Sequence, residues 1–193
     1  SSSGGLGFDA RTRDALRAQL EVKNELKIVP LMSCQRDLET YIATSCTLSD
    51  DTTNYIIGDR AVKMTIASAV GANFRRDFAG GFKFGRAQCI GVSIYIPDAT
   101  KIISISSTIF LDATGSQSWA RTKNSGLKNG WNYIRLSAVD AISAANADLW
   151  GTAYRVYVSV VTNEATDVTV GQVYAEVRPK ATMVFIWDGP YEQ

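Results

Sequence analysis

Apolar and polar residues alternate along most of the chain from about Tyr41 onward, and this period of two is typical of half-buried β-strands. Val62, Met64 and Ile66 fall on one face of an extended segment, while Lys63 and Thr65 fall on the other. The same alternation assigns one face to the core in four further segments: Ile90, Val92, Ile94 and Ile96; Ile103, Ile105, Ile109 and Leu111; Asn132, Ile134 and Leu136; Tyr154, Val156, Val158 and Val160. A last segment, 168–177, changes phase at Gly171, which predicts a β-bulge.

Turn-forming pairs separate these segments, among them Gly58–Asp59, Gly80–Gly81, Pro97–Asp98 and Asn129–Gly130. Roughly eight strands result, each with an apolar and a polar face. Two sheets of this kind bury their apolar faces against each other. We therefore predict an all-β fold, a two-sheet antiparallel β-sandwich of jelly-roll type, with a closed lipocalin-like barrel as the alternative.

The N-terminal region differs from the rest of the chain. Ser1–Gly7 has the composition of a flexible leader, and Asp9–Lys27 is the one convincing helical segment, with Asp9 as its N-cap. We expect a short connecting helix there, or alternatively an attachment or oligomerisation element. The predicted organisation is a leader and helix over 1–40, a β-sandwich over 41–180 and a terminal strand over 181–193.

Composition excludes several classes of function. The 193 residues are 46% apolar and 20% charged, and 20 Lys and Arg balance 19 Asp and Glu, so no general grip on nucleic acid is expected. The chain contains no histidine, which removes the Ser-His-Asp triad, the Cys-His pair and every His-containing zinc site. No run approaches the ~20 apolar residues of a membrane helix, so we expect no membrane insertion.

Three cysteines, Cys34, Cys46 and Cys89, are too few and too irregularly spaced for a four-thiolate metal site. We expect buried free thiols, with one disulfide as the alternative. No cofactor is expected. Acidic side chains could supply oxygen ligands for a structural calcium ion, although turn capping is the default interpretation; they are Asp50, Asp51, Asp59 and Glu176.

Aromatic and arginine residues are interleaved on strand faces that the alternation turns away from the core. A sugar offers an apolar C–H face and a rim of hydroxyls, so its receptor needs flat rings and planar donors. The candidate binding residues are Tyr133, Arg135, Arg155, Tyr157 and Tyr174, with the turn-adjacent Trp119, Trp131 and Trp150 as extensions of the same platform. Alternatively, these tyrosines are ordinary residues of a half-buried sheet and Trp131 covers the end of the core.

Three segments resemble the final strands of a galactose-binding-like, carbohydrate-binding-module jelly roll. They are LKNGWNYIRL (Leu127–Leu136), YRVYVSVV (Tyr154–Val161) and VGQVYAEVRPK (Val170–Lys180), and a Trp-containing loop, Asp148–Trp150, follows the first. The resemblance implies a noncatalytic module that binds carbohydrate.

The segment ATMVFIWDGPYEQ (Ala181–Gln193) resembles the opening strand of polysaccharide deacetylase domains, which such modules often precede in secreted and bacteriophage tail proteins. Where that family has two adjacent aspartates, this chain has Trp187 and Asp188, and the metal-binding histidines of the family are absent. Asp188 is therefore at most a vestige of that motif, and we expect no catalysis by this chain.

These observations lead to an expected setting and two alternatives. We expect an extracellular or virion-associated module of a phage tail or secreted glycan-targeting protein. Its partners would be a glycan or polysaccharide surface and other subunits of a homo-oligomer or virion. The alternatives are a structural virion or surface protein, whose jelly roll mediates subunit assembly, and the non-catalytic part of a polysaccharide deacetylase.

Overall fold

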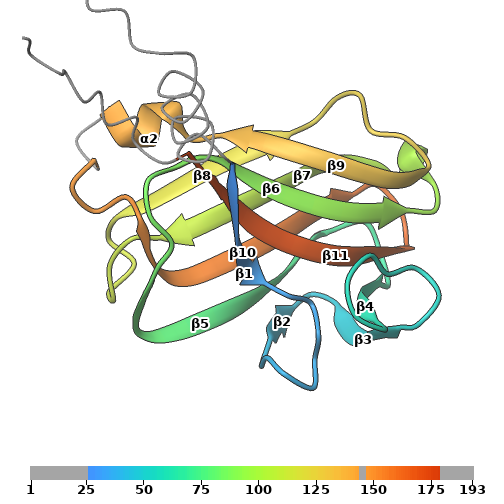
Figure 1. Cartoon of the computed structure of the whole chain (residues 1–193). Helices are drawn as coiled ribbons and strands as arrows, with labels where there is room; N and C mark the ends of the chain where they lie inside the picture. Colours follow the sequence, from blue (N-terminus) through green and yellow to red (C-terminus); the bar gives the residue numbers. More distant parts are fainter. Residues whose placement is uncertain (1–25, 144–146, 179–193) are drawn as a thin grey trace, which may run out of the picture. The chain divides into compact units, whose positions relative to one another are not determined.

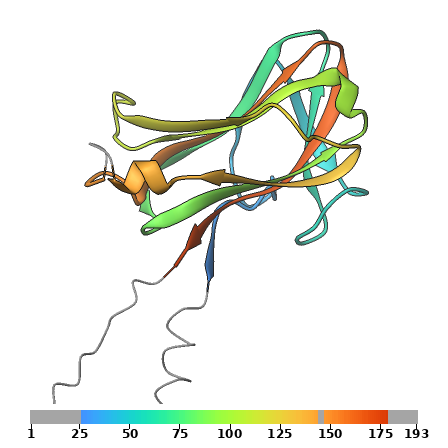
Figure 2. The same cartoon turned by 90° about the horizontal axis from the view of Figure 1, so that it is seen from above.

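The computed structural model describes residues 26–143 and 147–178, which form a sandwich of two sheets (Figures 1 and 2). In sheet A the strand order is β3 (Thr47–Asp51), β4 (Ala61–Ile66), β11 (Thr166–Val177), β6 (Ala87–Ile96) and β9 (Gly130–Ser137), and β1 (Lys27–Met32) also pairs with β11. In sheet B the order is β2 (Ile42–Thr44), β5 (Gly71–Lys83), β10 (Thr152–Thr162), β7 (Ile102–Phe110) and β8 (Ser118–Lys123). The predicted all-β antiparallel sandwich is confirmed.

Helical structure in the described residues is confined to two short segments, the 3₁₀ turn η1 (Ala99–Lys101) and the helix α2 (Val139–Ser143). Neither is long and apolar enough to cross a membrane. Asp98 caps η1 by accepting a hydrogen bond from the backbone N–H of Thr100.

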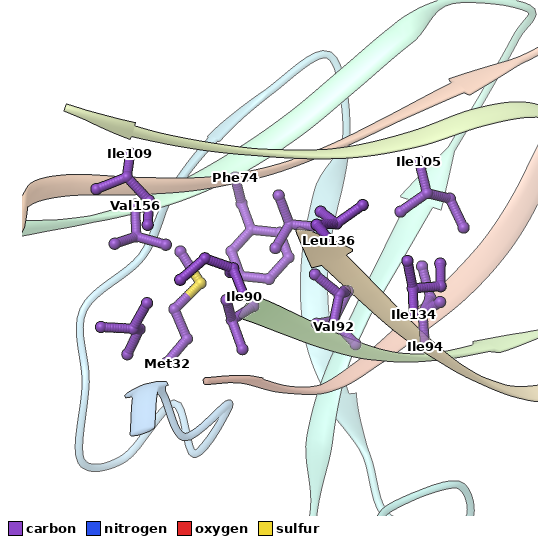
Figure 3. Packing of buried hydrophobic residues seen from close by; sticks show 14 of the residues in the cluster. Met32, Phe74, Ile90, Val92, Ile94, Ile105, Ile109, Ile134, Leu136 and Val156 are labelled. Carbon is purple, nitrogen blue, oxygen red and sulfur yellow. The ribbon is translucent and has the colours of Figure 1, made fainter. Parts of the chain in front are cut away.

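The core lies between the sheets and contains most of the residues that the alternation assigned to it. Val62, Met64 and Ile66 are buried, as are Ile90, Val92, Ile94 and Ile96 of β6. Phe74 of β5 is the largest fully buried side chain, and in Figure 3 it lies between residues of both sheets, among them Ile90 and Val156. Each such aliphatic residue contributes about 1.5–3 kcal/mol by leaving water, so the two sheets are held together chiefly by this layer.

Register shifts interrupt three of the strand pairings. Gly171 is skipped in the pairing of β11 with β6, where Val170 lies opposite Ile94 and Gln172 opposite Ser93, so the predicted bulge is confirmed. Gly80 and Gly81, which we predicted to be a turn, instead lie inside β5, where both have positive φ. Four residues of β5, from Phe78 to Gly81, bulge out there opposite the single residue Tyr154 of β10.

One predicted core residue is on the wrong face. Ile103 is 50% exposed, whereas its neighbour Ile102 is buried. The pairing of β10 with β7 shifts at this point, because Val161 lies opposite Ser104 but Thr162 lies opposite Ile102. The shift reverses the alternation at the start of β7, which a strict period of two does not show.

The sandwich also begins earlier than predicted. The strand β1 pairs with β11, so the boundary at residue 41 is wrong, and Lys27 begins this strand rather than ending a helix. Pro30 within β1 hides it from a pattern search, because proline cannot donate to a ladder and is tolerated mainly at sheet edges. The rest of the predicted helix, the terminal strand 181–193 and Asp188 lie outside the described residues.

Candidate functional site

The candidate binding residues do not share one surface. Trp131, Tyr133 and Arg135 of β9 and Tyr174 of β11 lie on the outer surface of sheet A, which we call the sheet-A face. Arg155 and Tyr157 of β10 lie on the outer surface of sheet B, the sheet-B face. Since the core separates the two sheets, the sequence prediction of a single platform is wrong.

Trp119 and Trp150 lie on neither the sheet-A face nor the sheet-B face. They are only 4% and 5% exposed, and their rings pack against each other with centroids 5.4 Å apart. The indole N–H of Trp150 donates to the carbonyl of Ala87 over 2.8 Å, and its ring meets Phe84 edge-on. Both tryptophans therefore belong to the core, which contradicts their predicted place in an exposed platform.

A row of three aromatic rings, Tyr95, Trp131 and Tyr133, lies on the sheet-A face. Trp131 and Tyr133 are two residues apart on β9, so both side chains point outward, with ring planes 17° apart and centroids 6.3 Å apart. Tyr95 of β6 meets Trp131 edge-on at 5.7 Å. Tyr133 is 63% exposed, which leaves its ring open to a ligand.

Two glycines let aromatic rings on this face lie against bare backbone. A Cβ atom on Gly171 would stand 2.9 Å from Cη2 of Trp131, and one on Gly91 would stand 2.1 Å from Cζ of Tyr174. Any larger residue at either position would have to displace the ring. Trp131 and Tyr174 therefore rest on glycine, a relationship between distant positions that the sequence alone does not display.

The loop between β3 and β4 extends the face. Ile56 of this loop also comes within 2.9 Å of the Cβ position of Gly171, so it borders Trp131. Tyr55, Ile56 and Ile57 are all exposed large apolar residues. Sequence reasoning missed them, although three consecutive apolar residues in a turn-rich segment are an unusual signal.

Asp51 anchors this loop at its first turn. Its carboxylate accepts hydrogen bonds from the backbone N–H groups of Thr53 and Asn54, each at 2.9 Å, and from the Thr169 hydroxyl at 2.6 Å. Burial raises the pKa of Asp51, but the hydrogen bonds outweigh it and hold the pKa at about 2. The loop is thus fixed to β11 by an ionised carboxylate.

Arg135 and Glu176 form a bidentate ion pair on the same face. Arg135 donates from Nε to Oε1 over 2.9 Å and from Nη2 to Oε2 over 2.5 Å. The side chain of Glu176 is only 7% exposed, whereas that of Arg135 is 60% exposed. The hydrogen bonds from Arg135 to Glu176 and the carboxylate charge raise the pKa of Arg135, so the guanidinium stays charged and faces solvent.

A pocket of about 350 Å³ runs along the edge strand β9. Its walls are Lys123 at the end of β8, the following loop with Lys128, and the β9 residues Trp131, Tyr133 and Arg135. Asn132 secures the loop, accepting from the Lys128 N–H and donating to the carbonyls of Lys128 and Gly130. The pocket thus has aromatic rings and cationic side chains in the same wall.

The sheet-B face has the same residue types in a different arrangement. The rings of Tyr157 and Phe110 are 5.2 Å apart, with Arg75 above the first and Arg155 above the second. Both arginines contact the same Oδ1 atom of Asp77, at 3.0 and 3.5 Å. Asp77 thus offsets one of the two positive charges, and both guanidinium groups are packed against rings of the same cluster.

The acidic residues considered for calcium do not come together. Asp50 pairs with Arg36 and Arg60, Asp59 with Arg60, Glu176 with Arg135, and Asp51 holds the loop. In residues 26–143 and 147–178 no group of three or more His, Cys, Asp or Glu residues could hold a metal ion. The proposed calcium site therefore has no support in the described part of the chain.

The three cysteines are free thiols, with Cys34 and Cys89 buried and Cys46 partly buried. The predicted free state is confirmed. Burial raises the pKa of all three thiols, which keeps them protonated at neutral pH.

No protein-family model matches the sequence, and no curated protein matches it. Among solved structures, the chain is similar to one whose description concerns the promiscuous specificity of carbohydrate-binding modules from the β-sandwich superfamily. The two share 18% identity, with a TM-score of 0.50 over 71% of this chain and 56% of that one. This chain therefore spans little more than half of that structure.

Two further structures are similar over most of their length. The family 11 carbohydrate-binding module of a cellulosomal cellulase of Clostridium thermocellum has 10% identity and a TM-score of 0.51, over 80% of this chain and 96% of that one. A mutant of a family 29 carbohydrate-binding module has 8% identity and a TM-score of 0.50, over 79% and 92%. The fold of this chain is thus similar to the β-sandwich of these carbohydrate-binding modules, as the sequence resemblance implied.

Proposed function

We propose that this chain is a noncatalytic carbohydrate-binding module that holds a glycan on its sheet-A face. The observation that carries the proposal is the nearly parallel pair of rings formed by the half-buried Trp131 and the exposed Tyr133. Flat rings two residues apart on a strand can stack on successive apolar sugar faces, while polar groups at the pocket beside them can bond the hydroxyls. The structural neighbours support this use of the fold, since their descriptions name carbohydrate-binding modules.

The chemistry available supports a noncatalytic role. Glycoside hydrolysis normally needs two free carboxyl groups on either side of the scissile bond. Two carboxylates at the sheet-A face, Glu176 and Asp51, are buried and occupied by hydrogen bonds, and a third, Asp167, is exposed. The chain has no histidine to replace them as a general base.

The strength of binding sets the expected context. Two stacking contacts contribute about 0.5–1.5 kcal/mol each, before ordering is subtracted, so a single copy binds weakly. Linked copies gain about 10²- to 10⁴-fold through avidity. We therefore place the module in an extracellular setting with several copies, either a phage tail or virion, or a secreted glycan-targeting protein. The deacetylase context depends on residues outside the described part.

The test compares removal of two rings from each face. The wild type, Trp131→Ala/Tyr133→Ala and the matched control Phe110→Ala/Tyr157→Ala are run through native gels containing soluble plant, fungal and bacterial polysaccharides. We expect at least one polysaccharide to retard the wild type. The sheet-A double variant should weaken binding about 5- to 150-fold, and the sheet-B double variant should not.

Two outcomes contradict the proposal. One is that no polysaccharide in the panel retards the wild type, which would favour a structural role in subunit assembly. The other is that both double variants, shown by circular dichroism to be folded, weaken binding equally.

A further inference from the structure

The pocket along β9 carries an imbalance of charge that stacking on neutral sugars does not use. Three cationic side chains, Lys123, Lys128 and Arg135, line it beside the rings of Trp131 and Tyr133. None of the described residues that line it is acidic. A pocket with charge of one sign attracts ligands of the opposite sign and disfavours others, because it concentrates the field at its walls.

Two of these cations have no ion-pair partner in the described part of the chain. Glu176 engages Arg135, but within residues 26–143 and 147–178 neither Lys123 nor Lys128 forms a salt bridge. On the sheet-B face, by contrast, Asp77 lies against both arginines. The pocket therefore presents net positive charge that no described side chain of the protein neutralises.

Both lysines are positioned on the wall of the pocket. The backbone N–H and carbonyl of Lys128 are bonded to the buried Asn132, at 3.0 and 2.7 Å. The ammonium of Lys123 lies 3.9 Å from the point that a Cβ atom on Gly126 would occupy, so it stands over the same loop. The backbone of Lys128 and the ammonium of Lys123 thus both lie at this loop, on the wall of the pocket that Trp131 and Tyr133 also line.

We propose that the ligand of this site is an acidic polysaccharide, whose sugar rings stack on Trp131 and Tyr133 while a carboxylate of the chain meets Lys123 and Lys128. The inference rests on the proposed function, since it names the class of glycan for the same face. Stacking supplies the apolar contact, and the two ammonium groups select the charged sugar over a neutral one of the same shape.

The test pairs each acidic polysaccharide with an uncharged form of the same chain. Polygalacturonate, alginate and hyaluronate are compared with their methyl-esterified forms, using the wild type, Lys123→Ala/Lys128→Ala, and the charge-matched control Lys27→Ala/Lys83→Ala. Lys27 and Lys83 are exposed and lie outside the pocket lining. Low salt is used, because solvent-exposed charges are screened at high ionic strength.

We expect at least one acidic form to bind, its ester to bind at least tenfold more weakly, and the pocket variant to lose about 3- to 30-fold in affinity while the control keeps wild-type affinity. Glu176→Gln, which releases Arg135 from its partner, should strengthen binding of the acidic form. Its fold is checked by circular dichroism.

The failures are distinguishable. If esters bind as tightly as acids and the pocket variant is unaffected, the acidic ligand is wrong while the carbohydrate-binding function stands. If both lysine variants lose affinity equally, the attraction is a general charge effect and the inference fails. If the wild type binds neither charged nor neutral chains, the proposed function itself fails.

Discussion

The two outer faces of the sandwich use tyrosine, arginine and acidic residues in contrasting ways. On the sheet-B face, Asp77 lies between Arg75 and Arg155, and each guanidinium covers a ring, so the cluster satisfies itself. On the sheet-A face, Tyr133 is open to solvent and the nearby lysines have no described partner. The comparison teaches that residue type alone does not define a binding surface. A charged or aromatic side chain is available to a ligand only where no other side chain of the protein already covers or neutralises it.

The largest difference in folding stability is expected between substitutions of two aspartates, one on each face. Asp51→Asn should destabilise the folded chain by on the order of 2 kcal/mol at pH 7, because the pKa of Asp51 is held at about 2, below its ordinary value of 3.8. That corresponds to a fall in Tm of about 4–8 °C. Asp77→Asn should cost less than about 1 kcal/mol, since Asp77 is 41% exposed and its ion pairs are screened.

The pH dependence of stability tests whether the ionised form of Asp51 is the stabilising one. Because the pKa of Asp51 is depressed in the folded chain, its stabilisation is present above about pH 4 and is lost as the pH falls toward 2. The Tm values of wild type and Asp51→Asn should therefore converge over that interval. A gap that stays constant from pH 7 to pH 2 would show that the ionised carboxylate does not hold the loop.

A smaller difference is expected between rings on the two faces. Phe110→Ala should cost about 1–2 kcal/mol of unfolding free energy, since the ring packs on Tyr157 and over Gly115. Tyr133→Ala should cost less than about 0.5 kcal/mol, because the ring is mostly exposed. Urea denaturation of both variants measures this, and equal losses would remove the distinction between a packed and an open face.

The smallest effect concerns two strand glycines. Gly171→Ala should cost less than about 1 kcal/mol but displace Trp131, shifting its fluorescence and weakening glycan binding about two- to fivefold. Gly71→Ala is the matched change in sheet B, where the nearest atom, Cγ2 of Val161, is 3.9 Å from the new Cβ. That variant should be neutral or slightly stabilised. Unchanged binding by Gly171→Ala would show that the placement of the indole is not required.

Local patterns predict much of this fold because burial follows strand periodicity directly. The alternation in β4, β6 and β9 identified inward residues such as Met64, Ile94 and Ile134, and the phase change at Gly171 identified the bulge. It failed at Ile103, where pairing with β10 shifts, and at β1, where Pro30 masks an edge strand. Register and edge position depend on partners distant in sequence, which a single segment does not contain.

The candidate site was less predictable for the same reason. Periodicity turned Tyr133 and Tyr157 away from the core, but only strand order places them on different sheets. Turn-rich flanks suggested exposure for Trp150, whereas its indole N–H finds a buried carbonyl at Ala87. Ile56 and Lys123 join the site through a loop contact and a pocket wall. The apolar run around Ile56 is a local signal that strand periodicity does not use, whereas Lys123 has no signal in its own neighbourhood in the sequence.

The indole of Trp131 rests against Gly171 and is flanked by Tyr95 and Ile56, so its rotation is already restricted before any ligand arrives. A sugar stacking on it gives up little side-chain entropy, whereas the exposed Tyr133 must be ordered on contact. The entropic penalty of association that calorimetry measures should accordingly come mainly from the ordering of Tyr133. Trp131 would serve as the preorganised half of the pair.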